Sequence, residues 1–402
     1  MKIGVIREGK TPPDKRVPFT PKQAKTIENN FESVEVLVQQ SEVRAFADQE
    51  YAKQGLALTT DLKDCEVIFG VKEVNLEDLL PHKTYFFFSH TIKEQPYNRD
   101  LLRTVLERNI RLVDYECLTH ANGQRILGFG RYAGIVGCYN GFLAYGQRTD
   151  AYSLKAANAC EDRAEMEREL PKIKLPNHFK IALTGFGRVA GGAIEVLEKV
   201  GIKKVTPQDY LEKEFKEPVY TQLSVEEYFR KPDGSAFKRE EVFEHPERFE
   251  SNFMTYAAET DLYIACHYWD SNGPNIFEKE EVKSSDFRIC TIADISCDIA
   301  GPIPTTIRPS TIADPIYQVD RKELKETAQV GEGSITVMAV DNLPCELPKD
   351  ASEGFGADLI EKILPCLLGD DPEKVIERAT IAQAGKLTSY FEYLEDYVKG
   401  EE

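Results

Sequence analysis

The sequence predicts an α/β protein with two doubly wound domains, and three observations lead to that prediction. The chain has 402 residues, which exceeds the usual size of one hydrophobic core. Apolar runs of strand length alternate with amphipathic segments, as in parallel sheets whose strands are joined by helices. This alternation occurs in two separate series, one near the N-terminus and one from residue 180 onward. With 42% hydrophobic residues, each series has enough apolar side chains for its own core.

The first series predicts a mostly parallel sheet. Amphipathic segments such as residues 21–31 and 98–109 separate its apolar runs. The runs that we expect to form strands are Lys2–Arg7, Val34–Gln40, Val67–Lys72, Thr84–Ser89 and Arg111–Glu116. The tail after Met338 has a helical pattern that is long enough to fold back onto this series. The sequence therefore predicts a first domain of residues 1–135 and 340–402.

The second series predicts a second domain of residues 136–339. A glycine-rich helical stretch at residues 132–148 leads into it, and its apolar runs begin at Lys180, Leu262 and Phe287. Between about residues 211 and 260 the composition turns charged and irregular, so we expect an insertion on the surface there.

Composition excludes several classes of partner. The balance of 50 basic against 68 acidic residues gives a net charge of −18, which opposes binding to nucleic acid or to an anionic membrane. No run approaches the roughly 18 apolar residues of a membrane helix, so a cytoplasmic protein is expected. The nine cysteines are scattered and show no spacing typical of a metal site. We expect a small-molecule substrate and leave open whether the chain forms a homo-oligomer.

A glycine turn after the first strand of the second series is the strongest local motif. The apolar run Lys180–Thr184 leads into Gly185 and Gly187, and a helical pattern follows. Such a turn lets the backbone approach a pyrophosphate at a helix N-terminus, which predicts dinucleotide binding. The alternative is a glycine turn with a structural role only. Asp209 is the one acidic candidate for the ribose hydroxyls about 20 residues later, and no arginine lies there for a 2′-phosphate. The choice between NAD and NADP stays open.

Polar residues stand where the strands of the first series end. Arg16 follows the first strand, Lys72 and Glu73 the third, His90 the fourth and Glu116 the fifth. Ligands of open parallel sheets bind at the carboxyl ends of the strands, so these side chains are expected to converge. Taken singly, each has an ordinary alternative, such as a solvated cation, a helix cap or a packed ring. Together they supply a cation, two groups that exchange protons near neutrality, and a carboxylate that tunes them.

Motifs spread along the chain resemble those of one enzyme family. RVPFTP, VKEV, FFFSHTIKEQ, RLVDYECL, FGRYAG, GFGRVAGGAIEVL, ADISCDIAG and AVDNLPCELPKDAS resemble, in that order, the lysine-forming saccharopine dehydrogenases and lysine–2-oxoglutarate reductases. More distantly they resemble alanine dehydrogenase and the soluble part of transhydrogenase. The resemblance implies two Rossmann-like domains with the active site in the interdomain cleft. It also implies reversible oxidation of saccharopine by NAD or NADP to lysine and 2-oxoglutarate.

Matching by motif assigns roles to residues of this sequence. The resemblance makes Lys72 and His90 the acid–base pair, and it places Arg16 and Gln95 at the substrate and Glu116 beside the pair. Positions that match cofactor contacts are Gly185, Gly187, Arg188, Tyr268, Ile295, Val340, Asp341, Asn342 and Leu343.

The chain departs from the family pattern after Glu116. Two adjacent arginines of the dehydrogenase branch are replaced by Gln124 and Arg125, which leaves Arg125 as a substrate-binding candidate and Arg131 as a substitute for the missing cation. An alanine dehydrogenase-like or other opine-forming enzyme remains an alternative. A nucleotide-binding regulator without catalysis is a second alternative, which the presence of Lys72, His90 and Arg16 opposes.

Overall fold

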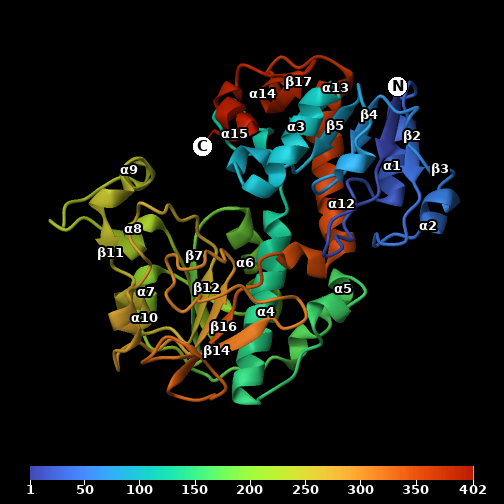
Figure 1. Cartoon of the computed structure of the whole chain (residues 1–402). Coiled ribbons are helices and arrows are strands. Elements are labelled where there is room, and N and C mark those ends of the chain that lie inside the picture. The colour runs from blue at the N-terminus through green and yellow to red at the C-terminus, as the bar shows by residue number, and fades with distance from the viewer. Residues whose placement is uncertain (402) are drawn as a thin grey trace. The chain divides into compact units, whose positions relative to one another are not determined.

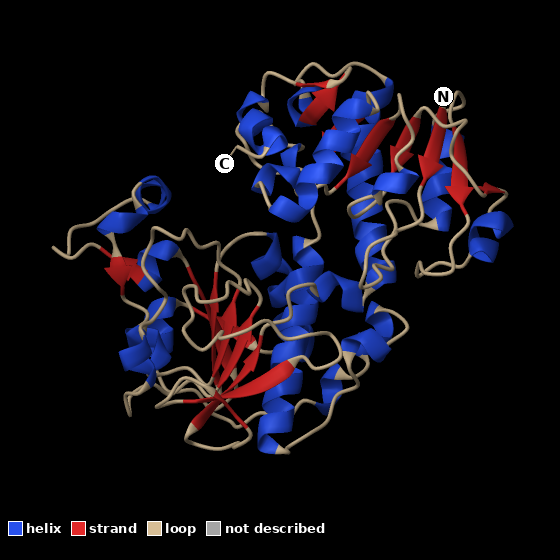
Figure 2. Ribbon diagram, viewed as in Figure 1, coloured by secondary structure: helices blue, strands red, loops and turns tan. Residues whose placement is uncertain are grey.

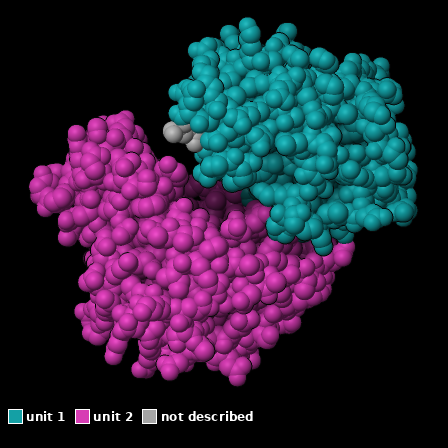
Figure 3. Space-filling view, viewed as in Figure 1, with its two compact units in different colours: residues 1–129, 348–402 teal, residues 130–347 magenta. Residues whose placement is uncertain are grey.

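The computed structural model describes residues 1–401 and divides the chain into two compact units. Unit 1 comprises residues 1–129 and 348–402, and unit 2 comprises residues 130–347 (Figure 3). The division falls after residues 129 and 347, whereas the sequence analysis places it after residues 135 and 339. The first boundary coincides with the start of helix α4 (Gly130–Thr149), which belongs to unit 2. Both units are α/β, as the sequence predicts (Figure 2).

Unit 1 contains an eight-stranded sheet in the order β18-β17-β6-β5-β4-β1-β2-β3 (Figure 1). Its strands are β1 (Lys2–Val5), β2 (Glu35–Gln39), β3 (Ala57–Thr59), β4 (Val67–Phe69), β5 (Thr84–Phe87), β6 (Arg111–Asp114), β17 (Thr380–Gln383) and β18 (Lys386–Leu387). The first six are parallel to one another, and β17 pairs antiparallel with β6. The C-terminal segment therefore extends the sheet of unit 1, which confirms that the tail folds back.

Helices flank these strands. The α-helices of unit 1 are α1 (Pro21–Asn30), α2 (Asp48–Lys53), α3 (Arg99–Glu107), α12 (Pro348–Asp358), α13 (Leu364–Leu368), α14 (Val375–Ala379) and α15 (Glu395–Lys399). Single turns lie at Leu76–Asp78, Thr91–Lys93, Pro96–Asn98, Tyr115–Cys117 and Glu392–Leu394, and Leu359–Ile363 is a π-helical turn. Helix α1 begins where it does because the Thr20 side chain accepts from the Gln23 backbone N–H, while the Gln23 side chain accepts from the Thr20 N–H.

The core of unit 1 is rich in aromatic rings. Tyr85, Phe86 and Phe87 of β5 are fully buried, as the apolar run predicts. The ring of Phe86 stacks on that of Phe69 in the neighbouring strand β4, with centroids 4.6 Å apart. Large rigid side chains on adjacent central strands fix the positions of the strand ends, where the candidate side chains stand.

Unit 2 contains a second eight-stranded sheet in the order β15-β14-β16-β13-β12-β7-β9-β8. Its strands are β7 (Lys180–Thr184), β8 (Lys203–Val205), β9 (Val219–Leu223), β12 (Leu262–Ala265), β13 (Thr291–Asp294), β14 (Ile316–Asp320), β15 (Glu326–Thr327) and β16 (Ser334–Met338). Six are parallel, and the antiparallel strands β14 and β15 close one edge. Strands β10 (Phe229–Arg230) and β11 (Glu250–Ser251) form a separate ribbon.

The expectation of a surface insertion at residues 211–260 is wrong in one respect. Strand β9, at residues 219–223, is buried along its whole length and pairs with the central strand β7. The run Val-Tyr-Thr-Gln-Leu has high strand propensity, but the charged segments on both sides dominate the average composition. The segment that leaves the sheet begins after Leu223 and carries the β10–β11 ribbon with helices α8 (Val225–Tyr228) and α9 (Arg239–Glu244).

The remaining helices of unit 2 are mostly short. They are α5 (Arg163–Glu167), α6 (Arg188–Val200), α7 (Pro207–Glu212), α8 (Val225–Tyr228), α9 (Arg239–Glu244), α10 (Met254–Ala257) and α11 (Lys279–Val282), with single turns at Ala157–Ala159, Leu170–Lys172, Pro246–Arg248 and Leu343–Glu346. Helices α4 and α6 pack at glycines: a Cβ on Gly134 would lie 1.8 Å from the Val189 carbonyl oxygen. This close approach explains the glycine in FGRYAG. Among residues 1–401, no helix combines the length and apolar composition needed to cross a membrane.

Candidate functional site

The polar residues that follow the strands of unit 1 meet at one edge of its sheet. Lys72 and Glu73 follow β4, His90 follows β5 and Glu116 follows β6. These three strands are parallel neighbours, so their carboxyl ends lie side by side. The structure thus brings together groups that are up to 44 residues apart in the sequence.

Glu73 and His90 form the closest pair at this edge. His90 Nδ1 lies 2.5 Å from Glu73 Oε1, and each side chain is 14% exposed. Lys10 Nζ donates to Glu73 Oε2 over 3.0 Å. Burial acts to raise the pKa of Glu73, but the hydrogen bonds from His90 and Lys10 help to outweigh it, and the pKa falls to about 2. An ionised Glu73 accepts a hydrogen bond from Nδ1–H, and in that tautomer the lone pair of the neutral imidazole is on Nε2.

The backbone around His90 is held in place by neighbouring residues. His90 has a left-handed backbone conformation, with φ at +54°. Its ring stacks on Phe88, whose own ring contacts Tyr115 and Phe355. The Ser89 N–H and hydroxyl both donate to the buried carboxylate of Asp114. The aromatic run before His90 therefore supports a fixed imidazole at the strand end.

Lys72 lies in a setting that favours its neutral form. Burial lowers the pKa of the Lys72 ammonium, and the nearby cations Arg16 and Lys10 lower it further, against the opposing effect of Glu73 and Asp14. Glu8 accepts hydrogen bonds from the backbone N–H groups of Val71 and Lys72 over 2.7 and 2.9 Å. A lowered pKa makes the Lys72 ammonium easier to deprotonate than that of an exposed lysine.

Arg16 is buried and has an internal partner. Its Nε and Nη2 donate to the two carboxylate oxygens of Asp14 over 3.0 and 2.6 Å, and its guanidinium lies 4.2 Å from the centre of the Phe129 ring. Burial acts to raise the pKa of Asp14, but Arg16 holds it below the usual range. The structure therefore places Arg16 beside Lys72 as a buried charge, and contact with a substrate carboxylate stays a prediction.

Glu116 contacts two cations. Arg125 Nη2 and Lys93 Nζ lie 3.3 and 3.6 Å from Glu116 Oε1. Glu116 Oε2 is buried and has no hydrogen-bond partner among residues 1–401. The carboxylate that contacts His90 is Glu73, whereas the family resemblance places Glu116 beside the pair. Gln95 lies in an exposed turn, where its side chain donates to the Lys93 carbonyl over 3.3 Å.

Three charged residues of this site were not among the sequence-based candidates. Glu8, Asp14 and Lys10 all lie within the loop after β1, near Arg16. Burial raises the pKa of Glu8 to about 8. The position of this loop, after the first strand of a parallel sheet, is the signal that would have found them, because such loops reach the same edge as the other strand ends.

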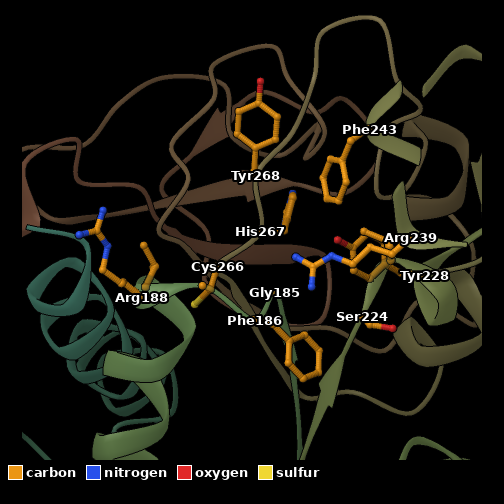
Figure 4. Close-up of a pocket in the computed structure, with 13 residues that line it drawn as sticks. Gly185, Phe186, Arg188, Ser224, Tyr228, Arg239, Phe243, Cys266, His267 and Tyr268 are labelled. Atoms are coloured by element: carbon orange, nitrogen blue, oxygen red, sulfur yellow. The ribbon is translucent and has the colours of Figure 1, made fainter. Parts of the chain in front are cut away.

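Unit 2 has a pocket of about 370 Å³ at the carboxyl edge of its own sheet (Figure 4). Its lining residues are Gly185, Phe186, Gly187, Arg188, Val189, Ser224, Val225, Tyr228, Arg239, Phe243, Cys266, His267 and Tyr268. They follow β7, β9 and β12, three adjacent strands, or belong to helices α6, α8 and α9. Four predicted cofactor contacts, Gly185, Gly187, Arg188 and Tyr268, thus line one pocket.

The glycine turn fits a nucleotide phosphate. Gly185 has φ at +103°, and a Cβ there would lie 2.5 Å from the Cys266 carbonyl oxygen, so the position requires glycine. Gly187 is the residue before the 13-residue helix α6, and a Cβ there would meet no atom within 4 Å. The turn therefore leaves open space in front of the N–H groups of a helix N-terminus, where a pyrophosphate would bind.

Other predicted cofactor residues lie along the same sheet edge without lining this pocket. Ile295 follows β13, and Val340–Leu343 follow β16. Ile295, Val340 and Leu343 are buried, and Asp341 is exposed. Because β7, β12, β13 and β16 are consecutive parallel strands, these residues continue the edge that begins at Gly185. Their contact with a cofactor stays a prediction.

Two charged residues that the sequence analysis considers for binding the cofactor or substrate lie outside this pocket. Asp209 is in helix α7, which follows the edge strand β8, and it pairs with Lys213 over 2.8 Å. Arg131 is in helix α4 and donates to both carboxylate oxygens of Glu195 in α6, over 2.6 and 2.8 Å. Neither residue lines the pocket described above. Strand β7 lies between β12 and β9, so β8, which Asp209 follows, is not a neighbour of the glycine-turn strand.

Comparisons with known proteins agree with this architecture. Residues 4–136 match the family described as alanine dehydrogenase/PNT, N-terminal domain. The solved structure of an L-alanine dehydrogenase superposes with a TM-score of 0.65, at 17% identity over 100% of this chain and 99% of its own. At that identity the likeness shows the fold, which has two doubly wound units.

Curated relatives match nearly the whole chain. Alpha-aminoadipic semialdehyde synthase of Mus musculus is 31% identical over 95% of this chain and 46% of its own length. Saccharopine dehydrogenase (NAD+, L-lysine-forming) of Candida glabrata is 26% identical over 90% of this chain and 91% of its own. The chain spans about half the length of the mouse relative and nearly all of the fungal one. The chain is therefore related, over nearly its whole length, to lysine-forming saccharopine dehydrogenases and to part of the alpha-aminoadipic semialdehyde synthases, and its residues 4–136 match the alanine dehydrogenase/PNT N-terminal family.

Proposed function

We propose that this chain is an NAD(P)-dependent, lysine-forming saccharopine dehydrogenase. It would catalyse the reversible conversion of saccharopine, NAD(P)+ and water to L-lysine, 2-oxoglutarate, NAD(P)H and a proton. One observation carries the proposal: a lysine with a lowered pKa and a carboxylate-bound histidine end adjacent strands of unit 1. Saccharopine would bind to unit 1, and the dinucleotide to the glycine turn of unit 2.

Lys72 would act first in the direction of saccharopine oxidation. The secondary amine of saccharopine must lose its proton before its α-carbon gives up a hydride. Neutral Lys72 would accept that proton, because burial and the charges of Arg16 and Lys10 disfavour its ammonium form. The bound nicotinamide would supply the hydride acceptor, and the carbon–nitrogen single bond of the substrate would become an imine.

His90 would act in the hydrolysis that follows. Glu73 holds the proton of His90 on Nδ1, so Nε2 is available to take a proton from water as it attacks the imine carbon. The imidazolium that results would return a proton to the amine nitrogen when the carbinolamine collapses to lysine and 2-oxoglutarate. The charge of Glu73 stabilises this imidazolium.

The charged residues around Glu116 would bind the substrate's polar ends. Saccharopine carries three carboxylates and one primary ammonium group. Arg125 and Lys93 are exposed cations beside Glu116 that would receive carboxylates. Glu116 Oε2, which has no partner among residues 1–401, would accept a hydrogen bond from the ammonium group.

A cofactor-oxidation assay tests the proposal. The purified chain should oxidise NADH or NADPH, followed at 340 nm, when lysine and 2-oxoglutarate are both present, and mass spectrometry should detect saccharopine. Omission of either substrate is the control. Oxidation with pyruvate and ammonia in place of lysine and 2-oxoglutarate would instead establish an alanine dehydrogenase-like enzyme. Nucleotide binding without turnover of any amino acid and oxo acid pair would refute an enzymatic function.

A further inference from the structure

The topology of unit 2 identifies where the adenosine ribose of a dinucleotide would be read. In a doubly wound domain, the residue that contacts the ribose 2′-position stands at the carboxyl end of the strand next to the glycine-turn strand. Here that strand is β9, because it pairs with β7 along its whole length. The Gln222 side chain at its end donates to the Gly185 carbonyl over 2.8 Å, which ties the end of β9 to the glycine turn.

No residue that lines the pocket at this position is a carboxylate. The residue after β9 is Ser224, whose hydroxyl donates to Glu227 as helix α8 begins. Among residues 1–401, the 13 that line the pocket include neither aspartate nor glutamate. An acidic side chain at the end of this strand favours NAD, because it accepts hydrogen bonds from the ribose hydroxyls and repels a 2′-phosphate. The chain lacks that feature although its net charge is −18.

A cation occupies the same place. Arg239 comes from helix α9, in the segment that leaves the sheet after β9, and lines the pocket with Ser224 and Tyr228. Its guanidinium lies 5.6 Å from the centre of the Phe243 ring. In the described part of the chain it makes no ion pair and no hydrogen bond. In Figure 4 Arg239 points toward the centre of the labelled side chains, whereas Arg188 points away from them.

Exposed aromatic rings surround this cation. Phe186, Phe243 and Tyr268 are 53%, 44% and 73% exposed, and all three line the pocket. Large apolar side chains that gather in the open around a cavity mark a ligand site, and aromatic faces suit a purine ring. The adenosine end of a dinucleotide would therefore lie between these rings, with its 2′-position near Arg239.

We propose that Arg239 binds the 2′-phosphate of NADP(H) and makes this chain selective for NADP(H) over NAD(H). The inference rests on the proposed function, in that it assigns the pocket of unit 2 to the dinucleotide. A guanidinium offers two parallel N–H groups to a phosphate, and an unpaired guanidinium gains more from a phosphate than one already bound to a carboxylate. The specificity determinant then comes from the charged segment that looked like a surface insertion.

Binding measurements test the proposal without catalysis. The fluorescence of NADPH and NADH is titrated with the full chain and with the variants Arg239→Gln and Arg239→Lys. We expect the wild type to bind NADPH about 10- to 100-fold more tightly than NADH. Arg239→Gln should weaken NADPH binding by that factor and change NADH affinity by less than about twofold. The NADPH affinity of Arg239→Lys should lie between those of wild type and Arg239→Gln, because lysine keeps the charge but lacks the two parallel N–H groups. Arg248→Gln is the matched control: Arg248 lies in the same segment, outside the pocket.

Calorimetry with two fragments isolates the phosphate. Adenosine 2′,5′-bisphosphate should bind more tightly than adenosine 5′-monophosphate to the wild type and equally to Arg239→Gln. An equal loss of NADPH and NADH affinity in Arg239→Gln, or a wild-type preference for NADH, would overturn the proposal. If neither dinucleotide binds, this inference and the proposed function both fail. If NADPH binds selectively but lysine and 2-oxoglutarate do not react, only the proposed reaction fails.

Discussion

Glu73 holds the imidazole of His90 by a 2.5 Å contact between Oε1 and Nδ1, although the two residues are 17 positions apart. The contact exists because β4 and β5 are parallel neighbours whose ends present both side chains at one edge. Glu73 has a second partner in Lys10, so its carboxylate is oriented from two sides. The pair sets which nitrogen of His90 is free to accept a proton.

Replacing Glu73 with glutamine should impair the histidine without removing it. The amide is able to donate to Nδ1, which would move the proton to Nε2 and remove the base. We expect Glu73→Gln to lower kcat by about 10- to 100-fold for lysine and 2-oxoglutarate, with little change in nucleotide affinity. Lys10→Met removes the second partner and keeps the carboxylate, so it should have a smaller effect. Equal kcat values for Glu73→Gln and wild type would contradict the role given to the pair.

Lys72 and His90 should each be required for turnover. Lys72→Met and His90→Gln remove separate proton carriers, so each should lower kcat/KM by about 100-fold or more while NADPH still binds. Lys63→Met, at an exposed lysine of the same unit, controls for the loss of a cation. Near-normal turnover in both site variants would exclude the assignment.

Arg16 should act on the pH dependence of the reaction. The base must be neutral, so the rate of saccharopine oxidation rises with pH through the pKa of Lys72, which Arg16 helps to lower. Arg16→Gln removes that repulsion, so the rising limb should move to higher pH. The variant also leaves Asp14 buried without its partner, which costs about 3–5 kcal/mol of stability.

A double variant separates these two effects of Arg16. Arg16→Gln with Asp14→Asn removes both charges and leaves neither of these two groups as a buried unpaired ion. The rise of the saccharopine oxidation rate with pH should therefore occur near the wild-type pH. An unchanged limb in Arg16→Gln, combined with a raised KM for saccharopine, would show that Arg16 binds a substrate carboxylate instead.

A side chain at Gly187 should block both dinucleotides alike. A Cβ there meets no protein atom within 4 Å, so Gly187→Val should fold but occupy the space of the pyrophosphate. We expect NADPH and NADH affinities to fall together by about 10-fold or more in fluorescence titrations. Gly191→Ala lies on the same helix in equally open space and should bind normally. A variant at Gly187 that keeps both affinities would remove the phosphate site from this turn.

The buried carboxyl of Glu346 should make stability depend on pH. Burial raises its pKa to about 7, against the hydrogen bond from Asn140 Nδ2 over 2.8 Å. The folded chain then keeps this proton from about pH 4.5 to 7, where the unfolded chain releases it, so stability falls as pH rises. The free energy of unfolding of Glu346→Gln should rise relative to that of wild type by up to about 3 kcal/mol as the pH increases from 5 to 8.

Urea unfolding at several pH values measures that difference, and Glu332→Gln, an exposed carboxyl of the same unit, controls for the loss of one charge. A constant difference between Glu346→Gln and wild type across the range would contradict the titration of Glu346.

Local patterns in the sequence predicted the strands and the edge of unit 1 well. Apolar runs such as Thr84–Ser89 are long and bounded by polar residues, and the rule that parallel strands end at one edge brought Lys72, His90 and Glu116 together. The sequence did not show which carboxylate contacts His90, because Glu73 and Glu116 both stand at strand ends. Only side-chain geometry distinguishes Glu73, which contacts His90, from Glu116, which contacts Arg125.

Strand order explains what the sequence missed in unit 2. Strand β8 comes before β9 in the chain, so a spacing of about 20 residues after the glycine turn leads to Asp209. In the sheet, β9 lies between β7 and β8, so the residues that follow β9 take that position. The spacing of residues along the sequence does not show that β8 and β9 are out of chain order in the sheet. The charged segments on both sides of β9 also made this buried strand hard to recognise.

The pairing of β17 with β6 has a consequence for the order in which the protein is made. Residues 1–129 leave the ribosome first, but β6 gains this neighbour only when residues 380–383 have been synthesised. By then the whole of residues 130–347 has emerged as one uninterrupted stretch. Unit 2 is thus able to complete its sheet while the nascent chain grows, and unit 1, which starts earlier, must wait with the edge of β6 uncovered.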